Sequence, residues 1–281
     1  MIVEDAQAKP ILQTLVRTRT IIRARFHRKF AKDIAVLAGF LPRGGTYLDI
    51  GAREGRFTGE LARANGGDCL VFAFEPVSYF SEILERISGR RSNVTCVPTA
   101  LSDKAGEFEY FRRVRPNGLL GHAVFPHPER RKQIVEAKTP RFVAERGRCA
   151  RLDDEIARVG IGRVDFIKID VEGHELRVIE GGVETIARDL PTLETEISAQ
   201  TLLHTNDSGR TVLEVLGDLG YRFYNLDRAC TLGWCDDAGT ILDHLRKSEK
   251  HTDVLCWHPK GATGPEVPAF QGSMAGTQFE G

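Results

Sequence analysis

The chain has 281 residues, of which 41% are hydrophobic, so it can bury the core of one large domain. Its 39 basic and 39 acidic residues cancel to a formal net charge of zero, and no global field favours nucleic acid or an anionic membrane. We therefore expect no nucleic-acid partner. The six cysteines stand singly with no CxxC pair, which is typical of reduced thiols in a cytosolic protein.

The first residues do not have the pattern of a targeting segment. Acidic residues stand in MIVEDAQAKP where a secretory signal has basic residues and then an apolar run. No later run reaches the length that spans a membrane. We expect a cytoplasmic protein without a transmembrane segment.

Residues 11–41 show the pattern of a basic amphipathic helix. Ile22, Phe26, Phe30 and Ile34 recur every four residues, and arginines and lysines fill the other faces. Such a helix commonly docks on its own domain through the apolar stripe. Peripheral contact with a membrane, or binding of phosphates, is the alternative for a helix of this charge.

Short apolar runs then alternate with helical patterns. The runs expected to be strands are TYLDI (46–50), CLVFAFE (69–75), NVTCVP (93–98), 106–111, 149–152, 164–171, 192–197, 221–226 and 254–257. Helical patterns occupy residues 54–64, 78–87, 153–159, 174–188 and 207–219. Strands that alternate with helices predict an α/β fold, a mostly parallel sheet covered by helices on both faces.

Two sections fall outside this alternation. Residues 112–148 are locally basic and lose their periodicity, which indicates either a substrate-binding loop or lid, or a tolerated surface insertion. Residues 261–281 are rich in Gly and Pro, and we expect a flexible tail. The predicted organisation is an amino-terminal basic helix (1–41), one main domain (42–260) and this tail.

The first strand runs into a glycine-bearing turn. In an open parallel sheet, ligands bind beyond the carboxyl ends of the strands, where Asp49 and Gly51 are expected. Gly51 and Gly55 let the backbone approach a ligand closely, and Ala52 keeps the turn narrow. The helix that follows is expected to present free amides.

A carboxylate ends the second strand. Glu75 stands 24 residues after Gly51, where an acidic residue can accept hydrogen bonds from both hydroxyls of a ribose, and Pro76 would fix its direction. A dinucleotide-binding turn usually reads GxGxxG, whereas Arg53 occupies the middle glycine position. The Asp49 carboxylate would repel a pyrophosphate but attract the ammonium of a methionine moiety. The turn therefore favours S-adenosylmethionine over NAD.

The order of these motifs resembles that of the FkbM-type methyltransferases, a branch of the class I S-adenosylmethionine-dependent enzymes. The resemblance covers residues 47–197 and is carried by YLDIGAREG, VFAFEP, ALSDKAG, RLDDEI, DFIKIDVEGHELRVIEGG and PTLETEI. It implies a three-layer α/β/α, Rossmann-like sandwich with a seven-stranded sheet. It also implies methylation of a hydroxyl on a small-molecule or glycan acceptor, such as a sugar, a glycolipid or a polyketide-like product. The family commonly has asparagine where Arg53 stands and an uncharged residue where Glu54 stands, so a changed ligand contact or a local salt bridge is expected here.

The stretch DVEGHE follows the fourth main strand. Asp170 is expected at the same edge of the sheet as Gly51 and Glu75, so we predict that it orients the acceptor or serves as the base. His174 is the rival base, because imidazole titrates near neutral pH. Lys168 shares the side of Asp170 by the period of two and is expected to pair with an acid. We attribute Glu172 and Glu175 to the start of a helix.

Three alternatives stay open from the sequence. A divalent metal could be held by Asp170, Glu172, His174 and Glu196, although we do not favour this. The same sheet could serve an NAD-linked oxidoreductase. It could also be a non-catalytic binding module whose basic helix contacts a membrane or a partner protein.

Overall fold

The computed structural model describes residues 18, 21–22, 30–114, 120–124, 142–198, 209–226, 234–235, 237–248 and 251–261. The predicted tail after 261 and most of the predicted helix before residue 30 lie outside this range. No helix in the described residues has the length and apolarity to cross a membrane.

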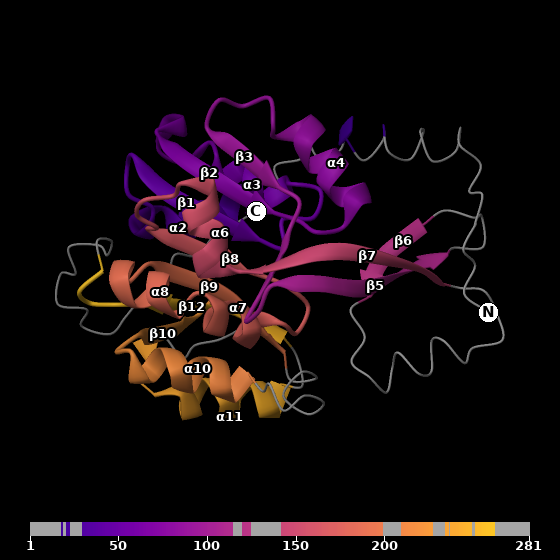
Figure 1. Cartoon of the computed structure of the whole chain (residues 1–281). Coiled ribbons are helices and arrows are strands. Elements are labelled where there is room, and N and C mark those ends of the chain that lie inside the picture. The colour runs from indigo at the N-terminus through magenta and orange to yellow at the C-terminus, as the bar shows by residue number, and fades with distance from the viewer. Residues whose placement is uncertain are drawn as a thin grey trace, which may run out of the picture.

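A mixed sheet of eight strands forms the centre of the molecule (Figure 1). Its order is β11-β10-β12-β9-β8-β1-β2-β3. The strands are β1 (Gly45–Ile50), β2 (Cys69–Phe74), β3 (Val94–Val97), β8 (Phe166–Ile169), β9 (Thr192–Ser198), β10 (Arg222–Asn225), β11 (Trp234–Cys235) and β12 (His251–Trp257). The pairs from β3 to β9 are parallel, and β12 pairs antiparallel with β9 and β10. The predicted mostly parallel sheet of seven strands is confirmed, and the two-residue β11 adds a short edge.

The order of the strands reverses beside β1. The chain places β2 and β3 on one side of β1, and β8 and β9 on the other. Ligands of open α/β sheets bind at the carboxyl ends of the strands at such a reversal. The fold therefore brings the end of β1 next to the end of β8.

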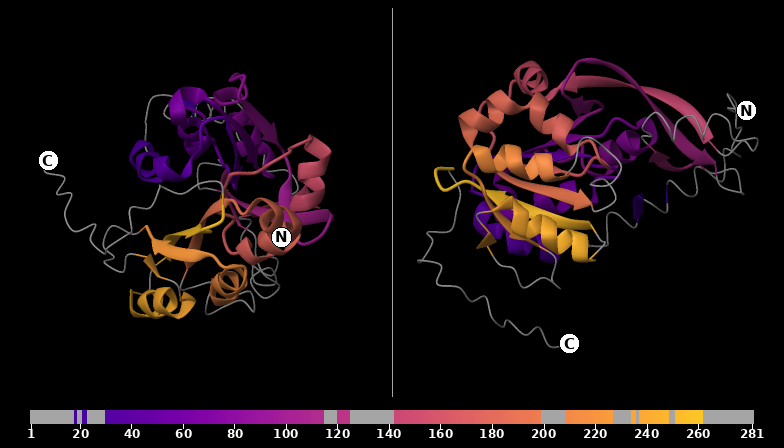
Figure 2. Two further views of the ribbon diagram at one scale, coloured as in Figure 1. Left: turned by 90° about the vertical axis from the view of Figure 1, so that its left-hand side faces the viewer. Right: turned by 90° about the horizontal axis from the view of Figure 1, so that it is seen from below.

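Helices cover both faces of the sheet (Figure 2). They are α2 (Ala31–Leu37), α3 (Arg56–Leu61), α4 (Ser78–Ile87), α6 (Leu152–Val159), α7 (Glu175–Gly181), α8 (Val183–Asp189), α10 (Gly209–Asp218) and α11 (Ala238–Ser248). Side chains alternate along β1, so Leu48 packs with the cluster under α6, α7 and α10 while Tyr47 packs with the cluster under α2 and α3. The three-layer sandwich is confirmed.

The end of the predicted amino-terminal helix packs on the domain. Ile34 and Leu37 of α2 and Phe40 of the following 3-10 turn (Ala38–Phe40) are buried in one cluster with Tyr47 and Phe57. Ile34 and Leu37 of the predicted stripe thus dock on the domain, whereas Ile22 at its start is 53% exposed. Membrane contact through the basic residues before 30 stays a prediction.

The helix predicted over residues 174–188 is two helices. α7 ends at Gly181 and α8 begins at Val183, with Gly182 between them in a non-helical conformation. Leu176, Ile179, Val183 and Ile186 recur at helical spacing, which predicts one buried stripe. Leu176, Ile179 and Ile186 are buried, but Val183 is 43% exposed because the break turns it outward.

A second sheet replaces part of the section that was predicted to be irregular. Its order is β4-β7-β5-β6, formed by β4 (Ala100–Ser102), β5 (Gly106–Val114), β6 (Leu120–Val124) and β7 (Phe142–Arg151). β5 and β7 pair antiparallel from Gly106 opposite Cys149 to Arg113 opposite Phe142, and they run out from the main sheet (Figure 1). The start of β5 and the end of β7 agree with the strands predicted at 106–111 and 149–152. The pattern of 112–148 hid β6 and the rest of β5 and β7, because their partners are distant in sequence and several of the paired residues are charged.

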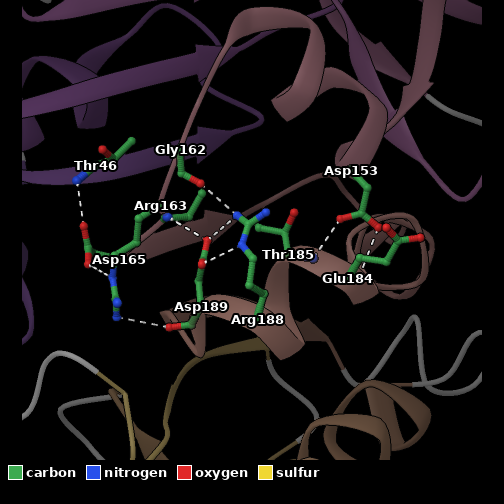
Figure 3. A network of polar contacts seen from close by, with 10 residues as sticks. Thr46, Asp153, Gly162, Arg163, Asp165, Glu184, Thr185, Arg188 and Asp189 are labelled. Atoms are coloured by element: carbon green, nitrogen blue, oxygen red, sulfur yellow. Dashed lines mark hydrogen bonds and ion pairs between the residues drawn. The ribbon is translucent and has the colours of Figure 1, made fainter.

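A polar network ties the amino ends of β1 and β8 to the end of α8 (Figure 3). The backbone N–H of Thr46 donates to Asp165 Oδ2 at 3.0 Å, and that of Val164 donates to Asp189 Oδ2 at 2.9 Å. Arg188 also donates to both oxygens of Asp189. This network lies at the edge of the sheet opposite to the carboxyl ends of the same strands, so it fixes the sheet rather than the candidate site.

Candidate functional site

The turn after β1 is bonded to the end of β2. The backbone N–H groups of Gly51 and Ala52 both donate to the carbonyl oxygen of Phe74 at 3.0 Å, and the N–H of Gly55 donates to the Ala52 carbonyl at 2.8 Å. The turn thus uses these N–H groups to close on itself and on β2. The free amides expected from the helix that follows, α3, stay a prediction.

Gly51 also contacts the turn after β8. It has a φ of +86°, and a Cβ atom placed on it would lie 1.9 Å from the carbonyl oxygen of Asp170. Gly55 has a φ of +77°, and its Cβ would lie 2.5 Å from Leu84 Cδ1 of α4. Both glycines are therefore required by packing within the protein, in addition to any contact with a ligand.

Glu75 is buried at the end of β2, with both carboxylate oxygens bonded to backbone. Oε2 accepts the N–H of Arg53 at 2.8 Å, and Oε1 accepts the N–H of Val77 at 2.8 Å. Burial raises the pKa of Glu75 to about 7, although these two hydrogen bonds oppose the shift. Pro76, which follows, is half-buried. The carboxylate is thus held in one orientation beside the turn of Gly51.

Arg53 supplies the link between these two segments. Its φ of 51° lies in the left-handed region, which lets its N–H point at Glu75. Its side chain is 43% exposed, and its Nε lies 3.9 Å from Glu54 Oε2 in a long ion pair. Of the two alternatives expected for this departure from the family pattern, the local salt bridge is present, and a changed ligand contact stays a prediction.

Asp49 lies beneath the turn. Its side chain is fully buried, and Oδ2 accepts the Thr58 hydroxyl at 2.5 Å, while Oδ1 has no hydrogen-bond partner among the residues that the structure describes. Burial raises the pKa of Asp49, and the charge of Lys168 opposes the shift. The predicted contact between Asp49 and the cofactor stays a prediction.

Lys168 occupies the centre of a buried row of charges. It pairs in register with Asp49 on β1 and with Glu194 on β9, so the three side chains leave the same face of the sheet. Its Nζ lies 3.0 Å from Asp170 Oδ2, and its side chain is 12% exposed. Burial lowers the pKa of Lys168, but Asp170 and the other two acids outweigh it and raise the pKa to about 12. The predicted pairing of Lys168 with an acid is confirmed, and the lysine stays charged.

Asp170 and His174 flank a tight turn. Asp170 is one-third exposed, whereas His174 is exposed and directly precedes α7. Glu175 Oε1 closes the turn by accepting the N–H groups of Val171 at 3.2 Å and Gly173 at 3.1 Å. The assignment of Glu175 to the helix start is confirmed by these bonds.

Two further acids lie beside this turn on β9. Burial raises the pKa of Glu194 to about 8, and burial followed by the charge of Asp170 raises that of Glu196 to about 7. Glu194 is not among the site residues predicted from the sequence. The sequence contains a signal for it, because Glu194 and Glu196 alternate within an apolar strand and must therefore lie on the same face.

The described residues contain no group of three or more His, Cys, Asp or Glu side chains placed to hold a metal ion. Of the possible metal ligands predicted from the sequence, Asp170, Glu172 and Glu196 are close enough to influence one another electrostatically. They do not converge on a common point of coordination.

Comparisons with known proteins agree with this arrangement. A family model described as "Methyltransferase FkbM domain" matches residues 49–223. "Methyltransferase sdnD" of Sordaria araneosa is 30% identical over 165 residues, which cover 50% of this chain and 61% of that protein, so less than two thirds of that relative is matched.

Solved structures with a similar backbone are methyltransferases or related proteins. The FkbM methyltransferase of Methylobacillus flagellatus KT has a TM-score of 0.46 at 15% identity, covering 90% of this chain and 61% of that one. Fibrillarin of Aeropyrum pernix, solved with S-adenosyl-L-methionine, has a TM-score of 0.44 at 14% identity, covering 80% and 73%.

Proposed function

The chain belongs to the FkbM methyltransferase family, and on that premise we propose that it transfers the methyl group of S-adenosylmethionine to a hydroxyl of a small acceptor. The observation that carries the proposal is the junction of three strand ends. The Gly51 turn is hydrogen-bonded to the end of β2, its Arg53 N–H is bonded to Glu75, and Gly51 touches the Asp170 backbone.

The residues on the side of β2 fit a ribose. Each Glu75 oxygen accepts one backbone N–H, and a carboxylate oxygen has a further lone pair for a ligand hydroxyl. The two backbone bonds hold the carboxylate without using up its acceptors. We propose that Glu75 binds the ribose hydroxyls, with Pro76, Gly51, Ala52 and Gly55 shaping the backbone around the cofactor.

The turn does not suit a pyrophosphate. Dinucleotide-binding turns offer free backbone N–H groups to phosphate oxygens. Here the N–H groups of Gly51, Ala52, Arg53 and Gly55 are already bonded within the protein. This supports S-adenosylmethionine over NAD and therefore a methyltransferase over an oxidoreductase.

The side of β8 provides the groups for the acceptor. When bound, S-adenosylmethionine supplies an electrophilic methyl group. Asp170 Oδ2 accepts a hydrogen bond from Lys168 Nζ at 3.0 Å, which fixes the carboxylate beside the turn. We propose that Asp170 orients the acceptor hydroxyl and that His174, whose ordinary pKa lies near neutrality, takes up its proton.

The acceptor class follows the family: a sugar, a glycolipid or a polyketide-like product. Comparison of metabolites from a deletion strain and its parent by mass spectrometry tests this. We expect the parent to contain a compound that is one CH₂ unit heavier than the compound accumulating in the deletion strain, and purified protein with S-adenosylmethionine should convert one into the other. An accumulated compound that differs by two hydrogens would instead indicate a redox reaction.

A further inference from the structure

Arg112 is a charged residue in the interior of the protein. It lies on β5, its side chain is 4% exposed, and its guanidinium carbon lies 4.7 Å from the centre of the Tyr79 ring. Tyr79 belongs to the first turn of α4, a helix that begins three residues after Glu75. Figure 1 shows β5 and β7 running out beside α4. Arg112 is thus held next to the element that follows the proposed ribose carboxylate.

One edge of this guanidinium meets no acceptor in the described part of the chain. Nη1 donates to Glu145 Oε1 at 3.2 Å, and the other oxygen of Glu145 accepts the Tyr110 hydroxyl at 2.7 Å. Arg112 Nε and Nη2 are buried and have no hydrogen-bond partner among the described residues. These two nitrogens form the edge of arginine that binds a carboxylate or a phosphate through two parallel hydrogen bonds.

A second arginine in the same sheet shows the satisfied arrangement. Arg148 on β7 donates from both Nη atoms to the two oxygens of Glu155, at 2.9 and 2.8 Å. Buried donors without partners are destabilising, and a guanidinium does not relieve this by losing its proton. Two acceptor oxygens that the described residues do not supply would satisfy the Nε and Nη2 donors of Arg112.

The surroundings favour acceptor oxygens that carry negative charge. Glu145 is more exposed than Arg112, 21% against 4%, so solvent screens its charge more strongly. Arg53 adds a second cation beside α4, with its guanidinium carbon 5.8 Å from the Phe80 ring, which contacts the Tyr79 ring. Arg112 is consequently neutralised only in part.

We infer that Arg112 is the cation of a recognition site for an oxyanion, a carboxylate or phosphate group, on the methyl acceptor. This rests on the proposed methyltransferase function and adds a chemical class to its substrate. Methyl transfer occurs at the end of β8, so the anionic group lies at a distance from the methylated hydroxyl. The acceptor is then an extended molecule that reaches from Asp170 toward β5.

Calorimetric titration of the full-length protein with inorganic pyrophosphate, and separately with succinate, tests the site and distinguishes phosphate from carboxylate. The protein is first saturated with S-adenosylhomocysteine, and low ionic strength is used. We expect one saturable site for at least one anion. Arg112→Lys keeps the charge but loses the two-nitrogen edge, so binding should weaken about tenfold or more. Arg148→Lys should bind as the wild type does.

Glu145→Gln provides a change in the opposite direction. It removes the competing negative charge and should tighten anion binding, whereas a purely structural role of this pair would weaken binding in both variants. Absence of saturable binding to the wild type, or unchanged affinity in Arg112→Lys, would overturn the inference. Binding of S-adenosylhomocysteine is read separately and tests the proposed function. If it does not bind, the anion titration of the free protein still decides the Arg112 site.

Discussion

Arg53 orients the Glu75 carboxylate through its backbone N–H group. Its left-handed φ of 51° is unfavourable for a long side chain and common for asparagine, the residue typical of the family at this position. The N–H bond to Glu75 does not depend on the side chain. This backbone conformation lowers the stability of the fold. A residue that tolerates it better should raise the stability and keep the hydrogen bond to Glu75.

We predict that Arg53→Asn increases the free energy of unfolding by about 0.5–1 kcal/mol, because asparagine tolerates this conformation better. Urea denaturation of the two proteins measures the difference. Arg43→Asn is the control, since Arg43 is 78% exposed and is not among the residues with positive φ. Destabilisation by Arg53→Asn would mean that the guanidinium contributes more than its long contacts suggest.

At the level of elements, the paired glycines before α8 explain how α7 reaches the second sheet. A Cβ atom at Gly181 would lie 1.9 Å from the carbonyl oxygen of Ser102 on β4, and one at Gly182 would lie 2.4 Å from Leu152 Cδ2 on α6. The motifs RLDDEI and IEGG, which carry much of the resemblance to the family, therefore meet each other in space. The glycines of the second motif let the end of α7 pack closely on β4 and α6. This packing supports the part of the fold that positions Asp170.

Gly181→Ala should destabilise the protein strongly, by about 3 kcal/mol or more, because the clash is with backbone that cannot move aside. Thermal and urea unfolding measure the change. Gly217→Ala is the matched control in α10, where a Cβ would be 3.8 Å from Phe223. Alanine there should be neutral or stabilising by up to about 1 kcal/mol. Similar effects of both substitutions would argue against this packing.

The junction between α6 and β7 predicts a dependence of stability on pH. Burial alone would raise the pKa of Glu155, but hydrogen bonds from Arg148 and Arg158 lower it from 4.5 to about 2. A carboxylate with a depressed pKa in the folded state stabilises the fold above its unfolded pKa. That contribution is lost as the pH falls from about 4.5 toward 2.

The difference in unfolding free energy between the wild type and Glu155→Gln should therefore shrink by about 1–2 kcal/mol between pH 6.5 and pH 3, allowing for the half-exposed arginines. Urea titrations at both pH values give this difference. The comparison with the variant removes the contribution of other titrating groups. A difference that is constant with pH would show that the Glu155 pKa is not depressed in the fold.

At the scale of the whole molecule, the features that can be predicted from the sequence are those that depend on local patterns of residues. The order of parallel strands follows from apolar runs alternating with helices, and the neighbourhood of Gly51, Glu75 and Asp170 follows from each being at a strand end. The pairing of Lys168 with an acid follows from the period of two.

Other features depend on partners that are far apart in the chain. The pairing of β5 with β7 left no local signal, and neither the Gly51 contact with Asp170 nor the row from Asp49 to Glu194 can be derived from spacing within one segment. The break at Gly182 depends on how closely α7 packs on β4. Long-range packing of this kind decides which glycines serve a ligand and which serve the fold.

The central claim is that one edge of the sheet divides into a cofactor side at Glu75 and an acceptor side at Asp170. Calorimetric titration with S-adenosylmethionine, and with NAD as the competitor, tests it in the wild type, Glu75→Gln and Asp170→Asn. We predict one S-adenosylmethionine per chain, affinity reduced about tenfold or more in Glu75→Gln, affinity within about threefold of the wild type in Asp170→Asn, and no saturable binding of NAD. Binding of NAD without S-adenosylmethionine, or an equal loss in both variants, would contradict the account.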